Sequence, residues 1–480
     1  MDFKLRCIAC GAEYLPQEIR YNCDCGGLLD VEHDLDSLRE QVSRELFDNR
    51  LGDLALPYAS GVWRYRELIL PLDERAIVSR PEGNTNLYRP STALRRTPGP
   101  LALVLDPLSL GTVLDRTVQC QRTKGDKYRA PGTKGSGQGS GHCSLGLSNW
   151  LGVDDLYLKH EGENPTGSFK DRGMTVGVTQ AKLLGCRAVA CASTGNTSAS
   201  LAAYAALAGL SAIVFVPQGQ IAFGKLSQAL AYGAKTLQVR GDFDTAMRLV
   251  RQTCDELGIY LLNSVNPFRL EGQKSIVFEA LQQLGWEVPD WIVLPAGNLG
   301  NTSAFGKALY ELKELGLIGR MPRLAAVQAQ GANPFYRSFL GGFQQRESVE
   351  ARTIATAIRI GDPVSYPRAV RALRWTDGLV AEVTDQEIMD AKARVDAAGI
   401  GCEPASAAAV AGAKKLVEAS VIGRKEKVLV ILTGHLLKDP QATVGYHLEK
   451  LAGLTPAYAN CPVAIEPTLE AVQEALEGRL

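Results

Sequence analysis

The chain has 480 residues, and its 52 Lys and Arg balance its 52 Asp and Glu, so the formal net charge is zero. That balance argues against a nucleic-acid-binding protein, which normally carries a basic excess. Hydrophobic residues make up 45% and charged residues 22%, as in soluble globular chains. No apolar run approaches the ~18 residues that a membrane span needs. The N-terminus lacks the apolar core of a signal peptide, which predicts a cytoplasmic protein with reduced thiols.

Residues 1–30 form a cysteine-rich segment that contains Cys7-x-x-Cys10 and Cys23-x-Cys25. Two close Cys pairs resemble a zinc ribbon, in which four thiolates hold one tetrahedral zinc ion. The second pair has one intervening residue instead of two, which is geometrically less favourable. Structural zinc is one interpretation. The other is a small knuckle with reduced thiols, or one that has lost its metal site.

The next two segments differ in composition. Residues 31–94, the N-terminal part of the catalytic region, are mixed and polar, and they end in Glu82-Gly-Asn-Thr-Asn-Leu-Tyr88, a turn-rich entry to a strand. Residues 95–147 are basic and contain the tract GDKYRAPGTKGSGQGSG. Such a tract buries too little apolar surface to offset its ordering entropy, so we predict a disordered insertion. A basic patch for an anionic partner is the alternative.

From residue 148 to about 450, short apolar strands alternate with helices, and 451–480 form a C-terminal tail. Strands that are apolar on both faces specify parallel sheets covered by helices on both faces, so the fold class is α/β. The predicted strands are Arg187–Ala192, Ala212–Val216, Lys235–Val239, Ile259–Leu262, Trp291–Leu294 and Lys427–Leu432. The predicted helices are Ser168–Leu184, Ala199–Leu207, Lys225–Tyr232, Asp244–Leu257, Leu270–Leu284 and Ser303–Leu315.

Lys170 follows a turn made by Pro165 and Gly167, in the string KHEGENPTGSFKDRG. In the first turn of the predicted helix, the positive end of the macrodipole lowers the pKa of an amine. A Lys there is poorly placed for helix stability, but it is well placed as a neutral nucleophile that forms an imine with an aldehyde. The alternative is a solvated surface Lys.

Three further segments follow predicted strands, at the edge where α/β sheets bind ligands. Ser193-Thr-Gly-Asn-Thr-Ser198 suits a carboxylate, an anionic oxygen or a ring hydroxyl, although its hydroxyls could simply be N-caps. Pro295-Ala-Gly-Asn-Leu-Gly-Asn301 lets backbone amides converge on a phosphate, with a plain turn as the alternative. Leu432-Thr-Gly-His435 places a hydroxyl at a strand tip, where it can bond a heteroaromatic nitrogen.

An imine-forming Lys, a phosphate cradle, an anion loop and a hydroxyl for a ring nitrogen are the parts of a pyridoxal-phosphate site. The strings HEGENPTGSFKDRG, STGNTS, AGNLGN and LTGH, in that order, resemble threonine synthases of the pyridoxal-phosphate fold-type II, tryptophan-synthase-β-like, family. The resemblance covers 148–450 and extends to EGNTNLY and the cysteine segment. It implies a two-domain α/β fold with pyridoxal 5'-phosphate as cofactor. It also implies the last step of threonine biosynthesis, in which O-phospho-L-homoserine and water give L-threonine and phosphate by γ-elimination and β-hydration.

The resemblance implies roles for individual residues. Lys170 would be the Schiff-base lysine and the general acid/base, Asn196 would contact the ring hydroxyl, and Thr433 would meet the pyridine nitrogen. The residues that would hold the cofactor phosphate are Gly297, Asn298, Leu299, Gly300 and Asn301. The residues that would bind the substrate are Thr194 and Thr197 at its carboxylate, and Ser264 and Arg269 at its phosphate. A guanidinium matches phosphate bidentately; alternatively, Arg269 is a surface residue that pairs with Glu271 or Glu279.

The chain departs from the family pattern at Asn86, where the family usually has proline, and at 95–147. Joining Leu94 to Ser148 restores the family's usual segment, so 95–147 is interpreted as an insertion in a loop whose ends stay close together. The functional alternatives are a serine/threonine dehydratase or cysteine synthase on the same fold, or a catalytically silent homologue. The resemblance further implies a homodimer. Some relatives respond to S-adenosylmethionine, and no set of residues in this sequence decides whether this chain does.

Overall fold

The structure is a computed structural model, and it describes residues 3–90, 146–193, 195–218, 223–241 and 243–476. The chain divides into two units: one contains Met1–Thr92 and Leu145–Pro462, and the other contains Ala93–Ser144 and Val463–Leu480. In the second unit, the described residues include α16 (Leu469–Leu476). The predicted insertion 95–147 falls almost entirely outside the described residues, so its disorder stays a prediction.

The larger sheet of the first unit contains two of the predicted apolar strands, Trp291–Leu294 and Lys427–Leu432. Its members are β4 (Leu87–Tyr88), β5 (Asp155–His160), β10 (Trp291–Pro295), β11 (Arg323–Ala329), β12 (Leu379–Val383) and β13 (Lys427–Leu432). They are ordered β12-β11-β10-β13-β5-β4, and the neighbours run parallel except that β4 is antiparallel to β5. Because β5 and β13 are parallel neighbours, the loops that follow them leave the same edge of the sheet.

The six predicted helices of this unit begin and end within three residues of the predicted positions, and the unit contains other helices that were not assigned from the sequence. All the described helices of this unit follow in chain order. They are α1 (Leu35–Arg39), α2 (Arg44–Asn49), α3 (Arg66–Ile69), α4 (Leu147–Leu151), α5 (Lys170–Leu183), α6 (Asn196–Ala208), α7 (Phe223–Ala231), α8 (Phe243–Leu257), α9 (Pro267–Gln283), α10 (Gly300–Glu314), α11 (Pro334–Leu340), α12 (Tyr366–Trp375), α13 (Asp385–Ala397), α14 (Pro404–Glu418) and α15 (Pro440–His447). Among the described helices, none combines the length and the apolar composition that a membrane span requires.

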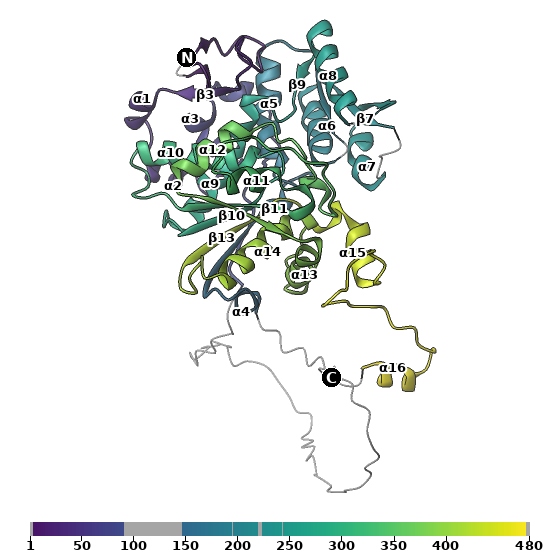
Figure 1. The fold of residues 1–480 in the computed structure, drawn as a ribbon. Coiled ribbons are helices and arrows are strands. Elements are labelled where there is room, and N and C mark those ends of the chain that lie inside the picture. Colours follow the sequence, from purple (N-terminus) through teal and green to yellow (C-terminus); the bar gives the residue numbers. More distant parts are fainter. Residues whose placement is uncertain (1–2, 91–145, 194, 219–222, 242, 477–480) are drawn as a thin grey trace, which may run out of the picture. The chain divides into compact units, whose positions relative to one another are not determined.

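Helices cover both faces of the larger sheet (Figure 1). On β10, Ile292 and Leu294 pack in one apolar cluster with α9 and α10. The alternate residues Trp291 and Val293 belong to a second cluster, with α13 and α14 on the opposite face. Successive side chains of a strand point to opposite faces, so a strand buried on both faces has to be apolar throughout. This burial is the physical reason for the uninterrupted apolar runs in the sequence.

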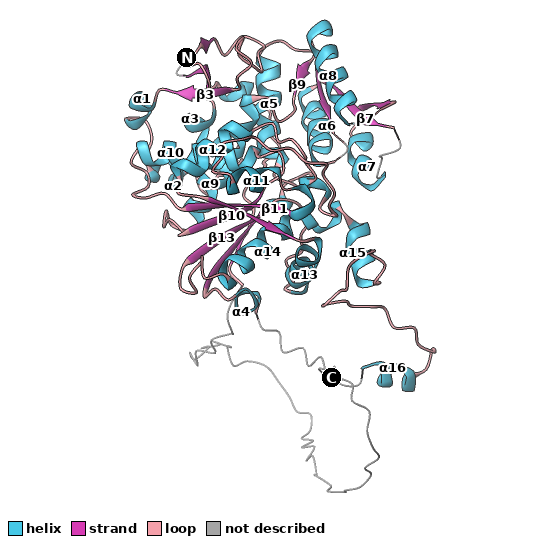
Figure 2. Cartoon of the chain, viewed as in Figure 1, coloured by secondary structure: helices cyan, strands magenta, loops and turns pink. Residues whose placement is uncertain are grey.

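A smaller parallel sheet repeats this layered arrangement (Figure 2). It consists of β6 (Ala188–Ala192), β7 (Ser211–Pro217), β8 (Lys235–Val239) and β9 (Tyr260–Leu261), in the order β8-β7-β6-β9. On β6, Val189 and Cys191 pack with α5 and α6, while Ala190 and Ala192 pack with α8. The α/β class, with parallel sheets covered on both faces, is therefore confirmed.

The cysteine-rich segment forms a small antiparallel sheet. Its strands are β1 (Phe3–Cys7), β2 (Glu13–Tyr14) and β3 (Leu29–His33), in the order β2-β1-β3. Leu29, Val31 and His33 of β3 are buried, and the two residues between them are partly exposed. One face of β3 therefore packs against the catalytic region.

Candidate active site

Lys170 is the first residue of α5, and it lies beside the loop that follows β13. The backbone N–H of Phe169 donates to the Thr433 carbonyl at 3.0 Å, and that of His435 donates to the Gly167 carbonyl at 2.9 Å. These two bonds join segments that are distant in the sequence. The structure thus brings together the predicted imine-forming Lys and the predicted ring-nitrogen hydroxyl.

The Lys170 amine is partly buried, and its Nζ lies 4.0 Å from the centroid of the Phe169 ring. Burial and, next, the positive charge of Arg269 lower the pKa of Lys170 to about 7, while the Glu403 carboxylate acts in the opposite direction. The sequence predicted this direction from the helix macrodipole, whereas the structure supplies it through burial and a neighbouring cation. A substantial fraction of the amine is therefore neutral, and nucleophilic, near pH 7.

Asn196 and Thr433 are connected through Glu403, a residue that the sequence analysis missed. Asn196 Nδ2 donates to Glu403 Oε2 at 3.1 Å, and Thr433 Oγ1 donates to Glu403 Oε1 at 3.4 Å. Glu403 is buried and directly precedes Pro404, the first residue of α14. A Cβ atom on Gly434 would overlap the Glu403 carboxylate, so a larger residue there would displace the carboxylate. One signal in the sequence could have indicated Glu403. It is an acidic residue directly before a helix of small apolar residues, and such a helix has to be buried.

The predicted phosphate cradle, Pro295–Asn301, leads from β10 into α10. Leu299 adopts the left-handed conformation with φ 62°, and Gly300 begins the helix. A Cβ atom on Gly297 would lie 2.9 Å from the Cα of Ile358, so the loop is packed closely against another segment. The first backbone N–H groups of a helix have no intrahelical partner, and they suit a phosphate group.

Ser264 and Arg269 reach the same region from the start of α9. Asn298 Nδ2 donates to Ser264 Oγ at 3.4 Å, which ties Ser264 to the cradle. Arg269 is 1% exposed, and its Nη1 donates to the Leu262 carbonyl at 3.1 Å. Its Nε and Nη2 have no partner among the described residues. Burial lowers the pKa of Arg269 to about 10, which leaves the guanidinium charged at neutral pH.

The carboxylates that were the alternative partners of Arg269 pair elsewhere. Glu279 Oε1 lies 2.9 Å from Arg172 Nη2, and Glu271 Oε2 lies 2.6 Å from Lys274 Nζ. Both carboxylates are buried. The interpretation of Arg269 as a surface residue that pairs with one of them is therefore wrong.

Close packing of α5 against α9 brings Arg269 near Lys170. A Cβ atom on Gly272 would overlap the carbonyl oxygen of Arg172, and one on Gly173 would lie 2.7 Å from the carbonyl oxygen of Arg269. Two helices can approach this closely only where they carry glycine at the contact. The glycines therefore allow the close packing that brings the buried Arg269 cation near enough to lower the pKa of Lys170.

A scan against protein families and a search of curated proteins extend these observations. Residues 143–434 match a family described as pyridoxal-phosphate dependent enzyme. The chain is 44% identical to a threonine synthase of Methanocaldococcus jannaschii over 443 residues, which are 92% of this chain and 94% of the relative. It is 42% identical to a threonine synthase of Methanosarcina acetivorans over 482 residues, 99% of either chain. The chain belongs to the threonine synthase family of pyridoxal-phosphate-dependent enzymes.

A solved structure agrees with this family at the level of the fold. The crystal structure of threonine synthase from Escherichia coli has a TM-score of 0.52 and 22% identity, and the match covers 68% of this chain and 79% of that chain. At this identity the likeness shows a common fold alone. It bears out the pyridoxal-phosphate fold type II that the sequence motifs predicted.

The residues gathered at the site of this threonine synthase family member fit its cofactor. At the site, the buried donors that lack a partner among the described residues include Ser168 Oγ, Arg269 Nε and Nη2, and Thr302 Oγ1. Buried donors cost free energy unless they are hydrogen-bonded, so these groups suit a bound anion. The glycine-rich start of α10 and the neighbouring Lys170 suit the phosphate and the aldehyde of pyridoxal phosphate.

Two residues predicted to bind the substrate carboxylate have different outcomes. Thr194 lies outside the described residues. Thr197 follows Asn196 in the first turn of α6 and is partly buried. Its role stays a prediction.

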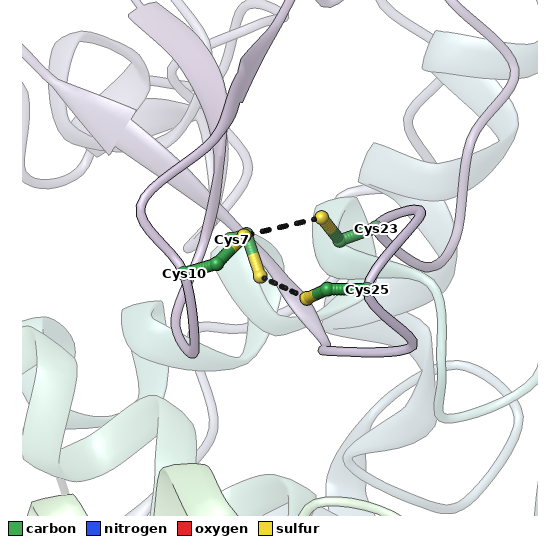
Figure 3. Close-up of side chains that lie close together, drawn as sticks. All are labelled: Cys7, Cys10, Cys23 and Cys25. Carbon is green, nitrogen blue, oxygen red and sulfur yellow. Dashed lines mark hydrogen bonds between the residues drawn. The ribbon is translucent and has the colours of Figure 1, made fainter.

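The four cysteines of the N-terminal segment converge on one point (Figure 3). Cys7 Sγ lies 3.6 Å from Cys25 Sγ, and Cys10 Sγ lies 3.5 Å from Cys23 Sγ. All four sulfur atoms lie within 4.8 Å of one another. The spacing is much longer than the S–S bond of a disulfide, which is about 2.05 Å.

Proposed function

We propose that this chain converts O-phospho-L-homoserine and water to L-threonine and phosphate. Support comes from relatives named threonine synthase that align over almost the whole chain at 44% and 42% identity. One observation on the site carries the proposal: the buried guanidinium of Arg269, with two nitrogen atoms unpartnered among the described residues, acts on the charge of Lys170. A phosphorylated amino acid needs such a second anion site beside the reactive amine.

When bound, pyridoxal phosphate supplies an electron sink for negative charge that develops on the substrate carbons. Lys170, neutral near pH 7, accepts the proton from the substrate Cα, and the same Nζ can return it at the end of the reaction. Arg269 binds the substrate phosphate, and its charge stabilises that group as it leaves with the electron pair of the carbon–oxygen bond. This departure also requires that one proton leaves Cβ, and Cγ gains a proton after the phosphate has left. Water then adds at Cβ, where its hydroxyl stays, and its remaining proton goes to the released phosphate or to solvent.

The remaining residues position the cofactor in this proposal. Asn196 contacts the ring hydroxyl, Thr433 meets the ring nitrogen, and Glu403 holds both side chains in place. The loop Gly297–Asn301 binds the cofactor phosphate through the backbone N–H groups at the start of α10. Ser264, bonded to Asn298, assists Arg269 at the substrate phosphate.

The decisive experiment compares two products of the purified holoenzyme. Phosphate release from O-phospho-L-homoserine, with L-threonine formed in equal amount, supports the proposal. Ammonia release from L-serine or L-threonine, without phosphate release, would instead identify a dehydratase on the same fold. Failure to turn over any of these substrates, in protein that carries the cofactor, would identify a catalytically silent homologue.

We also propose that Cys7, Cys10, Cys23 and Cys25 hold one structural zinc ion. With Zn–S bonds of about 2.3 Å, the edge of a tetrahedral site is about 3.8 Å, close to the sulfur–sulfur distances of 3.6 and 3.5 Å. A Cβ atom on Gly27 would lie 2.7 Å from Cys7 Sγ, so the glycine keeps space clear around the sulfur. These features support a metal site more than a knuckle of independent thiols.

Metal analysis of the purified chain tests the zinc proposal. We expect about one zinc per chain, as four thiolates in one tetrahedral site require. The variant Cys23→Ser should lose most of this metal, whereas Cys186→Ser, at a buried cysteine outside the cluster, should keep it. Equal metal content in the two variants, or a wild-type chain without metal, contradicts the proposal.

The homodimer and the cytoplasmic location implied by the family resemblance stay predictions. Sedimentation equilibrium of the purified chain measures the first, and a mass of twice 51.7 kDa is the expected result. Fractionation of cells that produce the chain measures the second.

A further inference from the structure

The strand β3 contacts three helices that also reach the predicted phosphate sites. These helices are α9, which begins near Arg269, α10, which begins at the phosphate cradle, and α12, which begins beside it. Each contact is made by a charged or imidazole side chain. The contacts therefore join β3, which begins at the end of the cysteine-rich segment, to the site through these helices.

The first contact fixes α9. His33 Nε2 donates to Glu271 Oε2 at 2.8 Å, and both side chains are 1% exposed. Glu271 lies two residues after Arg269 on the same helix. Lys274, one turn further along, forms ion pairs of 2.6 Å with Glu271 and with Glu311 of α10. The two helices are thus joined to each other as well as to β3.

The second contact fixes α10. Lys307 Nζ donates to the Val31 carbonyl of β3 and to Glu271 of α9. Its side chain is 11% exposed, so water screens these interactions only weakly. One ammonium group therefore sits where β3, α9 and α10 meet, two turns from the Gly300 N-terminus of α10.

The third contact fixes α12. Asp30 of β3 lies 2.8 Å from Arg368 Nε and also pairs with Arg371. Immediately before this helix, the backbone N–H of Val364 donates to Asn298 Oδ1 at 2.9 Å. Asn298 is the cradle residue that bonds Ser264. The position of α12 therefore affects the phosphate cradle through a direct hydrogen bond to Asn298.

We infer that β3 is a positioning element of the reaction, which fixes the distance between the Arg269 anion site and the phosphate cradle through His33, Lys307 and Asp30. The inference rests on the proposed function for the identity of the phosphorylated substrate. The cysteine cluster determines the conformation of β3, because Cys25 lies shortly before the strand and Cys7 pairs with Leu29 in register. An intact cluster is therefore a condition for substrate phosphate binding.

The central test uses Lys307→Met in the holoenzyme. Its matched control is Arg50→Met, since Arg50 is 13% exposed and pairs with Glu67, which lies on α3. Loss of a supporting contact of this kind costs about 10-fold or more in function. We expect the KM for O-phospho-L-homoserine and the inhibition constant of inorganic phosphate to rise about tenfold in Lys307→Met, with a smaller change in kcat. The control should change neither constant.

Thermal midpoints distinguish a positioning role of Lys307 from an effect of its substitution on the stability of the fold. If Lys307→Met and Arg50→Met lose similar stability, and both keep the wild-type phosphate constants, the inference is overturned. Calorimetric binding of inorganic phosphate to the holoenzyme gives the same comparison without turnover. If the wild-type chain binds phosphate but does not turn over O-phospho-L-homoserine, the proposed function is contradicted. In that case the phosphate binding constants of the variants still test the inference.

Two further variants keep the test decisive if Lys307→Met does not fold. His33→Phe removes the donor to Glu271, whereas His33→Gln keeps one. Weaker phosphate binding in the Phe variant, restored in the Gln variant, supports the inference, and equal constants in both overturn it. For the cluster, Cys25→Ser should weaken phosphate binding as Lys307→Met does. Unchanged binding in Cys25→Ser would overturn the link between the cluster and β3.

Discussion

The Asn196 amide donates a hydrogen bond of 3.1 Å to the buried carboxylate of Glu403. The same carboxylate accepts a bond from the Thr433 hydroxyl. Glu403 thus orients both groups that are predicted to contact the cofactor ring, although it was not recognised from the sequence. An Asn amide has two donor hydrogens, so the bond to Glu403 leaves one for a ring hydroxyl.

The variant Glu403→Ala should weaken binding of pyridoxal phosphate about tenfold, because each lost hydrogen bond contributes about 1 kcal/mol. Titration of the apoenzyme, followed by the visible absorbance of the bound cofactor, measures the affinity. Glu403→Gln is the control, since it keeps an acceptor for Asn196. Wild-type affinity in the Ala variant would show that the carboxylate does not orient the site.

The variant Lys170→Ala should abolish both turnover and the covalent attachment of the cofactor, because Lys170 is the amine that the site presents. Borohydride reduction of the holoenzyme, followed by peptide mass analysis, locates the attachment. Lys182→Ala, at an exposed lysine near the end of the same helix, should keep it. A reduced adduct at another lysine in the Lys170→Ala protein contradicts the assignment.

The pH dependence of cofactor attachment should report the lowered pKa of Lys170, about 7. The neutral amine is the reactive form, so the rate at which apoenzyme reacts with pyridoxal phosphate should rise through pH 7 and level off above it. Arg269→Met should move the midpoint up, because Arg269 lowers the pKa, and Glu403→Gln should move it down. A wild-type midpoint near the value of a free lysine, about 10.4, contradicts the prediction.

The variant Arg269→Ala should impair use of the phosphorylated substrate far more than cofactor binding. A charge-assisted contact to phosphate contributes roughly 2–4 kcal/mol, so kcat/KM should fall about 30- to 1000-fold. The kcat/KM of Arg269→Lys, which keeps the charge but loses the planar fork of the guanidinium, should fall less. If kcat/KM for O-phospho-L-homoserine is unchanged in the Ala variant, the phosphate is bound elsewhere.

Deletion of 95–147 should leave the cofactor absorbance intact and should not lower the thermal midpoint. The Ser148 hydroxyl donates to the Pro90 carbonyl, so the chain returns close to the point where it leaves the described residues. A shorter connection between nearby ends costs less closure entropy. The measurement compares thermal midpoint, protease susceptibility and turnover of the two proteins. A deleted protein that fails to fold would show that the segment contributes to the folded unit.

The sequence was sufficient where the physical signal is local. Strands such as Lys427–Leu432 were predicted because a strand buried on both faces is apolar throughout, and the structure has the same bounds. Several helices begin about three residues earlier than predicted, at Asn196, Pro267 and Gly300, because polar, glycine or proline residues at the start of a helix resemble a loop in the sequence. The apolar strand Arg323–Ala329 and the strand Leu379–Val383 were not assigned from the sequence.

The sequence by itself determined the α/β class, and it singled out Lys170 and the loop Gly297–Asn301 as candidates for imine formation and phosphate binding, because each of these signals depends on residues that are neighbours in the chain. Tertiary structure alone decided the burial of Arg269, the role of Glu403 and the contacts of β3. The burial of Arg269 follows from glycine contacts between α5 and α9. The others follow from contacts between residues far apart in the chain, such as Asn196 with Glu403 and His33 with Glu271. The charge state and the burial of a side chain depend on the groups that surround it in space, so a local sequence pattern does not reveal them.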